Sequence, residues 1–138
     1  MTPFRTALAD RLDCPPLTVP PITALRGIVI VAGGDLYSRL AFHLITALRG
    51  LGCRLPVELW HFSHEMTDGI RQVFAGEPGV QLVDVGAFCR ERGIATRAVA
   101  GRSAQHSGWW LKSFALAHSG FAEVMLLDAD NLPAAEPT

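Results

Sequence analysis

The stretch VMLLDADN, residues 124–131, decides how the rest of the chain is interpreted. Four apolar residues follow one another, and two carboxylates, Asp128 and Asp130, come next with one residue between them. A short apolar run that ends in a polar turn predicts a strand buried on both faces of a sheet. Ligands of open α/β sheets bind at the carboxyl ends of the strands, so we expect both carboxylates to lie at a binding edge.

The composition is that of a globular core. The chain has 138 residues, of which 49% are hydrophobic and 18% charged, and its formal net charge is -1. This length indicates one domain or part of one, and the near-neutral charge gives no reason to expect a nucleic acid or a membrane surface as a partner. Cys14, Cys53 and Cys89 form no CxxC pair, so we expect reduced thiols, two of them buried, and neither a zinc site nor disulfides.

No apolar stretch reaches the roughly 18 residues of a membrane span, and the N-terminus lacks the apolar core of a signal peptide. We therefore expect a cytoplasmic protein, with an anchored or secreted longer form left open. Residues 1–22 contain two Pro-Pro pairs and are expected to form an arm before a domain of residues 23–138. Only eight residues follow the second carboxylate, so we expect this domain to be truncated at its C-terminus.

Predicted strands and helices alternate along the chain. The strands are residues 26–32, 57–62, 80–85 and the run before Asp128, and the helices are residues 35–49, 64–74 and 108–119, with a short helix and a loop in residues 86–107. This order predicts an α/β, Rossmann-like fold with a mostly parallel sheet of about four strands and flanking helices.

Local signals add detail to these elements. Asp35 and Ser63 are residue types that cap helices, so we expect each to begin one. Leu36, Leu40, Leu44 and Leu48 fall on one stripe of the first helix and predict its buried face. The third strand alternates apolar and polar residues, which predicts a half-exposed position.

Three blocks of sequence match a known pattern in order and spacing. They are GIVIVAGGDLYSRLAFHLITALRGLGCRLPVELWH (27–61), GWWLKSFALAHSGFAEV (108–124) and MLLDADNLPAAEP (125–137). With these blocks the chain resembles the GT-A glycosyltransferases, in particular the mannosyltransferase family that includes the fungal α-mannosyltransferases. The resemblance implies transfer of a hexose, such as mannose, from a nucleotide diphosphate sugar to a hydroxyl acceptor on a glycan or another molecule.

The resemblance also implies roles for individual residues. Asp128-Ala129-Asp130 matches the Asp-X-Asp motif, in which Asp128 and Asp130 hold Mn²⁺ or Mg²⁺ on the donor diphosphate. Lys112 matches a basic residue that contacts the phosphates or the sugar, and the nucleoside is cradled by Ala32, Gly33, Gly34 and Tyr37. The chemistry is consistent, because two carboxylates can share one hard cation, and that cation offsets the charge that grows on a diphosphate leaving group.

Plainer interpretations remain open for each of these residues. The two carboxylates could be an acidic turn after a strand, and Lys112 could be a solvated lysine on an amphipathic helix. Gly33-Gly34 lacks the third glycine of a dinucleotide fingerprint. We expect at least one of Trp109 and Trp110 in the core.

The remaining basic and histidine side chains carry weaker signals. His61 and His64 lack a third metal ligand nearby. We interpret His106 as a loop residue and Arg90, Arg92, Arg97 and Arg102 as a solvated face.

Two other functions are kept as alternatives. One is an inactive remnant or a nucleotide-binding module without turnover. The other is a phosphohydrolase of the haloacid dehalogenase type, in which Asp128 would be the nucleophile. In that class the motif stands on the first strand, whereas here it follows the fourth predicted strand.

Overall fold

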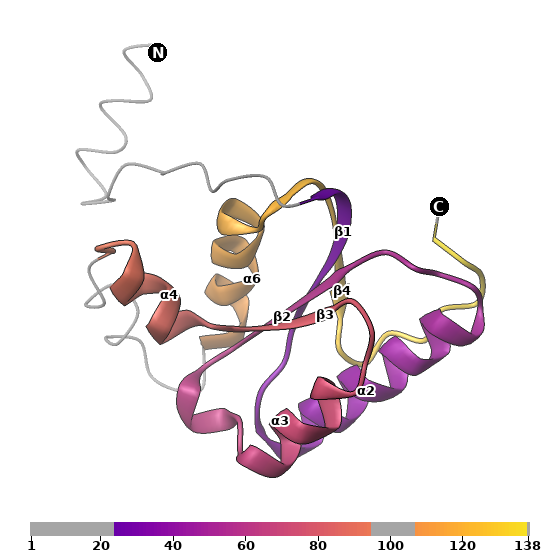
Figure 1. Ribbon diagram of the computed structural model, residues 1–138, viewed down its shortest axis with the longest axis horizontal. Coiled ribbons are helices and arrows are strands. Elements are labelled where there is room, and N and C mark those ends of the chain that lie inside the picture. Colours follow the sequence, from indigo (N-terminus) through magenta and orange to yellow (C-terminus); the bar gives the residue numbers. More distant parts are fainter. Residues whose placement is uncertain (1–23, 95–106, 138) are drawn as a thin grey trace.

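The computed structural model describes residues 24–94 and 107–137, which form a parallel sheet with helices on both faces (Figure 1). Its elements are β1 (Ala24–Val31), α2 (Gly34–Gly50), β2 (Val57–His61), the 3₁₀ turn η1 (Ser63–Glu65), α3 (Asp68–Ala75), β3 (Val80–Asp84), α4 (Val85–Glu91), α6 (Ser107–His118) and β4 (Phe121–Asp128). The α/β, Rossmann-like prediction with four parallel strands is confirmed. The predicted arm of residues 1–22 and the positions Cys14, Arg97, Arg102 and His106 lie outside the described residues.

The strand order in the sheet is β3-β2-β1-β4. The chain moves from β1 to β2 and β3 on one side, and α6 then brings it back to the other side of β1. The direction of winding therefore reverses between β1 and β4, and the carboxyl ends at such a switch point are where ligands of open α/β sheets bind. The parallel register pairs Val31, the last residue of β1, with Asp128, the last residue of β4.

Alternation along β1 creates two cores, one on each face of the sheet. Ile28 and Ile30 point to one face, and Val29 points to the other, because successive strand side chains alternate. The first core contains the buried side chains of α2 and α3, and the second contains those of α4 and α6. Each of these three residues of β1 is fully buried.

The helix α2 is held at both ends by features that the sequence encodes. Gly34 begins the helix with a φ of 71°, a left-handed conformation that favours glycine. Arg49 in the last turn donates to the carbonyl oxygens of Cys53, Leu55 and Pro78 at 3.0–3.1 Å. The Arg49 guanidinium thus links the end of α2 by hydrogen bonds to the segment before β2 and to the turn before β3.

The predicted helix of residues 64–74 is wrong in its first part. Residues 63–65 form the 3₁₀ turn η1, and α3 begins only at Asp68, where the Thr67 hydroxyl accepts from the N–H of Ile70 at 3.3 Å. Ser63 is not a helix cap, because its hydroxyl donates to the Asp84 carboxylate at the end of β3.

The other predicted cap is also wrong. Gly33 occupies the cap position of α2, and Asp35 lies inside the first turn, where it pairs with Arg39 at 2.9 Å.

Burial also differs from the prediction in two places. The strand β4 is not buried on both faces, because only its first residue, Phe121, is buried and Met125 is 37% exposed; it is also the last strand of the described sheet. Leu36 belongs to the predicted buried stripe of α2 but is 64% exposed. Of the other stripe residues, Leu44 and Leu48 are buried and Leu40 is partly buried; the buried residues of the whole helix α2 are Ser38, Ala41, Leu44, Ile45 and Leu48.

Other predictions are confirmed. Residues of β3 are partly exposed, as expected for the strand at the far edge. Cys53 and Cys89 are free and buried. Trp110 packs against the second core, whereas Trp109 is 79% exposed. No helix among the described residues has the length and hydropathy needed to cross a membrane.

Candidate functional site

The two carboxylates of the predicted motif lie on a turn at the end of β4. The N–H of Asn131 donates to the carbonyl oxygen of Asp128 at 3.0 Å, which closes the turn over Ala129 and Asp130. The methyl group of Ala129 is 5% exposed and packs into the first core, while Asp128 and Asp130 on either side of it are exposed. Burial of the middle residue therefore turns both carboxylates toward solvent.

Asp128 is paired with Lys112 of α6. The ammonium Nζ contacts Asp128 Oδ1, and the side chains are 27% and 49% exposed respectively. The same ammonium lies 5.3 Å from the ring centroid of Trp109, one turn earlier in the helix. The structure thus brings together Lys112 and Asp128, which the sequence analysis had placed in one site, and adds an aromatic ring that it had not.

The direction of α6 explains why Lys112 lies next to Asp128. The helix leads through Ser119 and Gly120 into the start of β4, so its C-terminal end lies at the amino edge of the sheet. It packs against β1 and β4 on the way, and its first turns therefore lie near the carboxyl edge. In Figure 1 the start of α6 lies on the same side of the sheet as the ends of the strands.

The segment after β1 forms the other part of this edge. The N–H of Ala32 donates to the carbonyl oxygen of Trp60 at 3.1 Å, and the Ala32 side chain is buried. A Cβ atom added to Gly33 would lie 2.1 Å from Glu65 Oε2 and 2.8 Å from Glu65 Cβ, so the Glu65 side chain would have to move if a larger residue replaced this glycine. Tyr37, on the first turn of α2, is 54% exposed.

The residues present can supply part of a cation site. No hydrogen bond or ion pair of Asp130 is formed within residues 24–94 and 107–137, and Asp128 is paired only with Lys112 there. The same residues contain no group of three or more His, Cys, Asp or Glu side chains arranged for a metal ion. Two carboxylates fit a cation such as Mg²⁺ or Mn²⁺ that takes its remaining ligands from water and substrate phosphates.

A second polar pair lies at the ends of β2 and β3. His61 is fully buried, its Nδ1 lies 3.0 Å from the Phe62 carbonyl oxygen, and burial lowers its pKa below the ordinary value of 6.5. The pKa of Asp84 is also below its ordinary value of 3.8, because hydrogen bonds from Ser63 and the N–H of Ala87 outweigh the opposing effect of burial. Asp84 therefore serves as the cap of α4.

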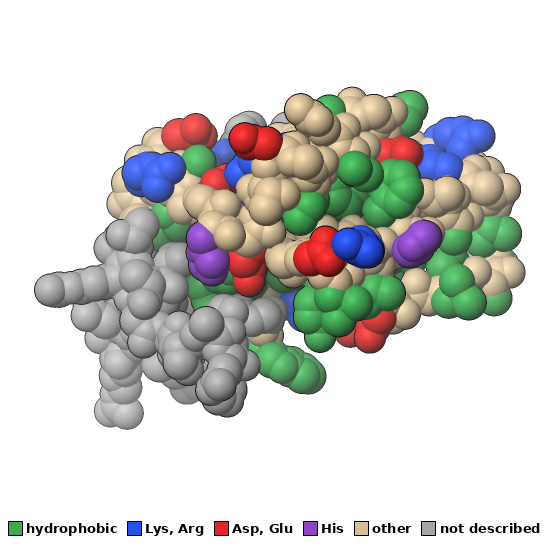
Figure 2. All heavy atoms as spheres, turned by 90° about the horizontal axis from the view of Figure 1, so that it is seen from below, with side chains coloured by type: hydrophobic (Ala, Val, Ile, Leu, Met, Phe, Trp, Pro, Cys, Tyr) green, Lys and Arg blue, Asp and Glu red, His purple; other side chains and the backbone are tan. Residues whose placement is uncertain are grey.

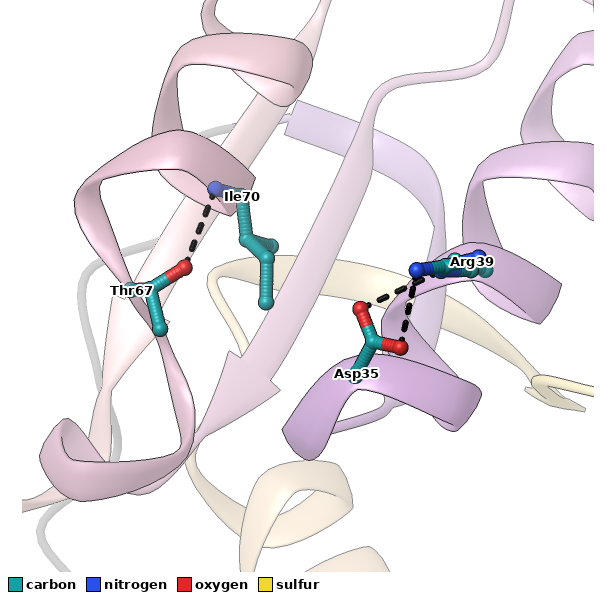
Figure 3. A network of polar contacts seen from close by, with 4 residues as sticks. All are labelled: Asp35, Arg39, Thr67 and Ile70. Carbon is teal, nitrogen blue, oxygen red and sulfur yellow. Dashed lines mark hydrogen bonds and ion pairs between the residues drawn. The ribbon is translucent and has the colours of Figure 1, made fainter.

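A groove of about 210 Å³ lies between α2 and α3. Its apolar lining consists of Phe42, Ile70, Val73 and Phe74. The Asp35–Arg39 ion pair lies on the α2 side of the groove, opposite Ile70 of α3 (Figure 3). Figure 2 shows that hydrophobic side chains lie beside acidic, basic and histidine side chains on the face seen from below. The groove includes neither Asp128 nor Asp130, and its volume is below the 300–1,000 Å³ of ordinary ligand pockets.

Two contacts of the edge were missed by sequence reasoning. The spacing of Trp109 and Lys112, three residues apart in a predicted helix, places them on one face and could have indicated their contact. No sequence signal indicated that Glu65 would lie against Gly33, because the turn η1 that carries it was predicted as regular helix.

The family model described as "Mannosyltransferase putative" matches residues 25–138, which cover every described element except the first residue of β1. No curated protein matches the chain.

Proposed function

The chain belongs to this mannosyltransferase family and is therefore glycosyltransferase-like. We propose that the carboxyl edge of its sheet binds a nucleotide diphosphate sugar, as in GT-A glycosyltransferases. The hexose, mannose by the family's description, is transferred to a hydroxyl acceptor such as a glycan. The single observation that carries the proposal is the contact of Lys112 with Asp128 at the reversal point of the sheet.

The charges at this edge fit the donor. Lys112 is the cation that Asp128 engages, and a diphosphate arriving at the edge competes with Asp128 for its ammonium. Asp128 and Asp130 would hold Mn²⁺ or Mg²⁺, in the manner of an Asp-X-Asp motif, with the remaining ligands supplied by the phosphates and water. Ala32, Gly33, Gly34 and Tyr37 border the nucleoside on the side of α2.

The reaction breaks the bond between the anomeric carbon and the diphosphate oxygen. A bond from the acceptor oxygen to that carbon forms, and the acceptor hydroxyl gives its proton to the leaving diphosphate or to water. The leaving diphosphate gains negative charge, and the Lys112 ammonium stabilises that charge. This contact accelerates the reaction because the ammonium binds the leaving diphosphate more strongly than it binds the intact donor. The bound cation supplies Lewis-acid stabilisation of the same charge.

The test is calorimetric titration of GDP, UDP, GDP-mannose and UDP-glucose, with and without Mn²⁺. We expect one nucleotide to bind in a manganese-dependent manner, and Asp130→Asn to weaken this binding at least about tenfold, since hydrogen bonds and contacts of charged groups are worth about 1.5–3 kcal/mol. Glu123→Gln is the matched control, because Glu123 is an exposed carboxylate of β4, the strand that leads to Asp130, and its partner is Arg26.

Two outcomes would contradict the proposal. One is the absence of binding by wild-type protein that melts cooperatively. The other is equal weakening by Asp130→Asn and Glu123→Gln, which would indicate a general charge effect. A covalent phosphoryl adduct on Asp128 after incubation with a phosphate analogue would instead favour the phosphohydrolase alternative.

A further inference from the structure

Trp109 differs in exposure from the other two tryptophans of the chain. Its side chain is 79% exposed, whereas Trp60 is 1% exposed and Trp110 packs into the second core. Exposed large aromatic side chains are uncommon unless they contact a ligand or a partner, because each leaves a large apolar area in water. Because Trp109 lies near the carboxyl edge of the sheet, a ligand bound at that edge can cover its ring.

The ring is connected to the carboxylate pair by one side chain. Lys112 Nζ lies 5.3 Å from the centroid of the Trp109 ring and also pairs with Asp128. Trp109 comes one turn before Lys112, so it extends about 5 Å further toward the edge of the sheet. A group attached to a phosphate held by Lys112 therefore lies next to an exposed indole.

We propose that the Trp109 indole packs against the pyranose ring of the bound donor, an inference that rests on the proposed function. In a nucleotide sugar the hexose is bonded directly to the terminal phosphate, so the sugar is the nearest apolar surface to Lys112. A pyranose presents C–H groups on its faces and hydroxyl groups around its rim. A flat aromatic ring with an open face matches the C–H surface while the hydroxyls stay hydrated.

The nucleobase is the competing partner for the ring, and two features favour the sugar. The base is separated from the terminal phosphate by a second phosphate and a ribose. Tyr37, the exposed aromatic residue proposed to border the nucleoside, lies in the first turn of α2, a helix that packs into the first core, whereas Trp109 belongs to α6, which packs into the second core. The two aromatic residues thus flank the edge from opposite faces of the sheet.

The test compares binding of a sugar conjugate with binding of the bare diphosphate. Affinities of GDP against GDP-mannose, and of UDP against UDP-glucose, are measured by calorimetry with Mn²⁺ for wild-type protein, Trp109→Ala and Trp109→Phe. Leu116→Ala is the control, because Leu116 is a 42% exposed apolar residue later in the same helix. Melting curves verify that each variant folds.

We expect Trp109→Ala to weaken the sugar conjugate about fivefold and the bare diphosphate less than about twofold. Trp109→Phe should fall between wild type and Trp109→Ala, and Leu116→Ala should match wild type. Equal weakening of conjugate and diphosphate would overturn the inference, since it would mean that the ring positions Lys112 or stacks on the base. Unchanged affinities would overturn it as well and leave the proposed function standing, whereas no binding of any nucleotide by wild-type protein would remove both.

Discussion

Replacement of Gly27 by alanine tests how β1 and β4 pack. A Cβ atom at position 27 would lie 2.2 Å from the Cδ2 and Cε2 atoms of Phe121 and 2.4 Å from its Cγ. Carbon atoms in contact normally stand 3.5–4.0 Å apart, so the ring must move by more than about 1 Å. Phe121 is 9% exposed and belongs to the second core, which leaves the ring little free space.

The expected cost follows from this overlap. Overpacking of a filled core costs about 1–3 kcal/mol, so we expect Gly27→Ala to lower the free energy of unfolding by about 2 kcal/mol. For a chain of this size the midpoint of thermal unfolding should fall by roughly 6–8 °C. Urea unfolding followed by circular dichroism gives the free energy, and an unchanged slope against urea verifies that the unfolded state is comparable.

Two controls isolate the contact. Gly50→Ala introduces the same methyl group in α2 at a position where no atom lies within 4 Å, so it should leave stability equal or slightly higher. In a Phe121→Leu background, Gly27→Ala should cost less than about 1 kcal/mol, because the smaller side chain can move aside. The reasoning is refuted if Gly27→Ala is as stable as Gly50→Ala, or if its cost is the same in both backgrounds.

Three further predictions concern groups away from the candidate site. Arg49→Ala should lower the free energy of unfolding by about 1–3 kcal/mol in urea titration, because three backbone carbonyls lose a charged donor, while Arg39→Ala on the exposed face of the same helix should have little effect. Ser63→Ala should be less stable than wild type above pH 3.8, because the Ser63 hydroxyl binds the ionised Asp84 carboxylate. The difference in stability should disappear as the pH falls through the lowered pKa of Asp84. A difference that persists in strong acid would contradict this role of the Ser63–Asp84 hydrogen bond. Stability should also decline as the pH falls below 6.5, since the unfolded chain takes up a proton that buried His61 with its lowered pKa does not, and His61→Gln should flatten that part of the profile.

The identity and order of most elements could be predicted from the sequence. Apolar runs predicted the strands, and the 3.6-residue periodicity of residues 35–49 predicted α2 to within one residue at each end. The alternation of strands with helices predicted a parallel sheet, because parallel neighbours need a crossover between them. These signals are local, so one sequence is enough to detect them.

Errors arose where local signals competed with distant partners. Ser63 is a good cap by residue type, yet its hydroxyl binds Asp84, which is 21 residues later in the chain. For Asp35 the competing partner is local: Gly33 takes the cap position, and Asp35 pairs with Arg39 one turn later in the same helix. The apolar run before Asp128 was interpreted as a strand buried on both faces, although burial of a strand depends on which helices and strands cover it in the fold.

For the site, the sequence by itself determined which groups are available: two carboxylates after a strand, a lysine in the helix before it, and a pair of glycines after β1. Tertiary structure decided that Lys112 contacts Asp128 and that both lie at the same edge of the sheet as the end of β1. The order β3-β2-β1-β4 places Asp128 beside Val31, and the return path of α6 carries Lys112 to Asp128 and exposes Trp109 next to it. Strand order and helix direction depend on how two cores are filled at once, and no single stretch of sequence contains that information.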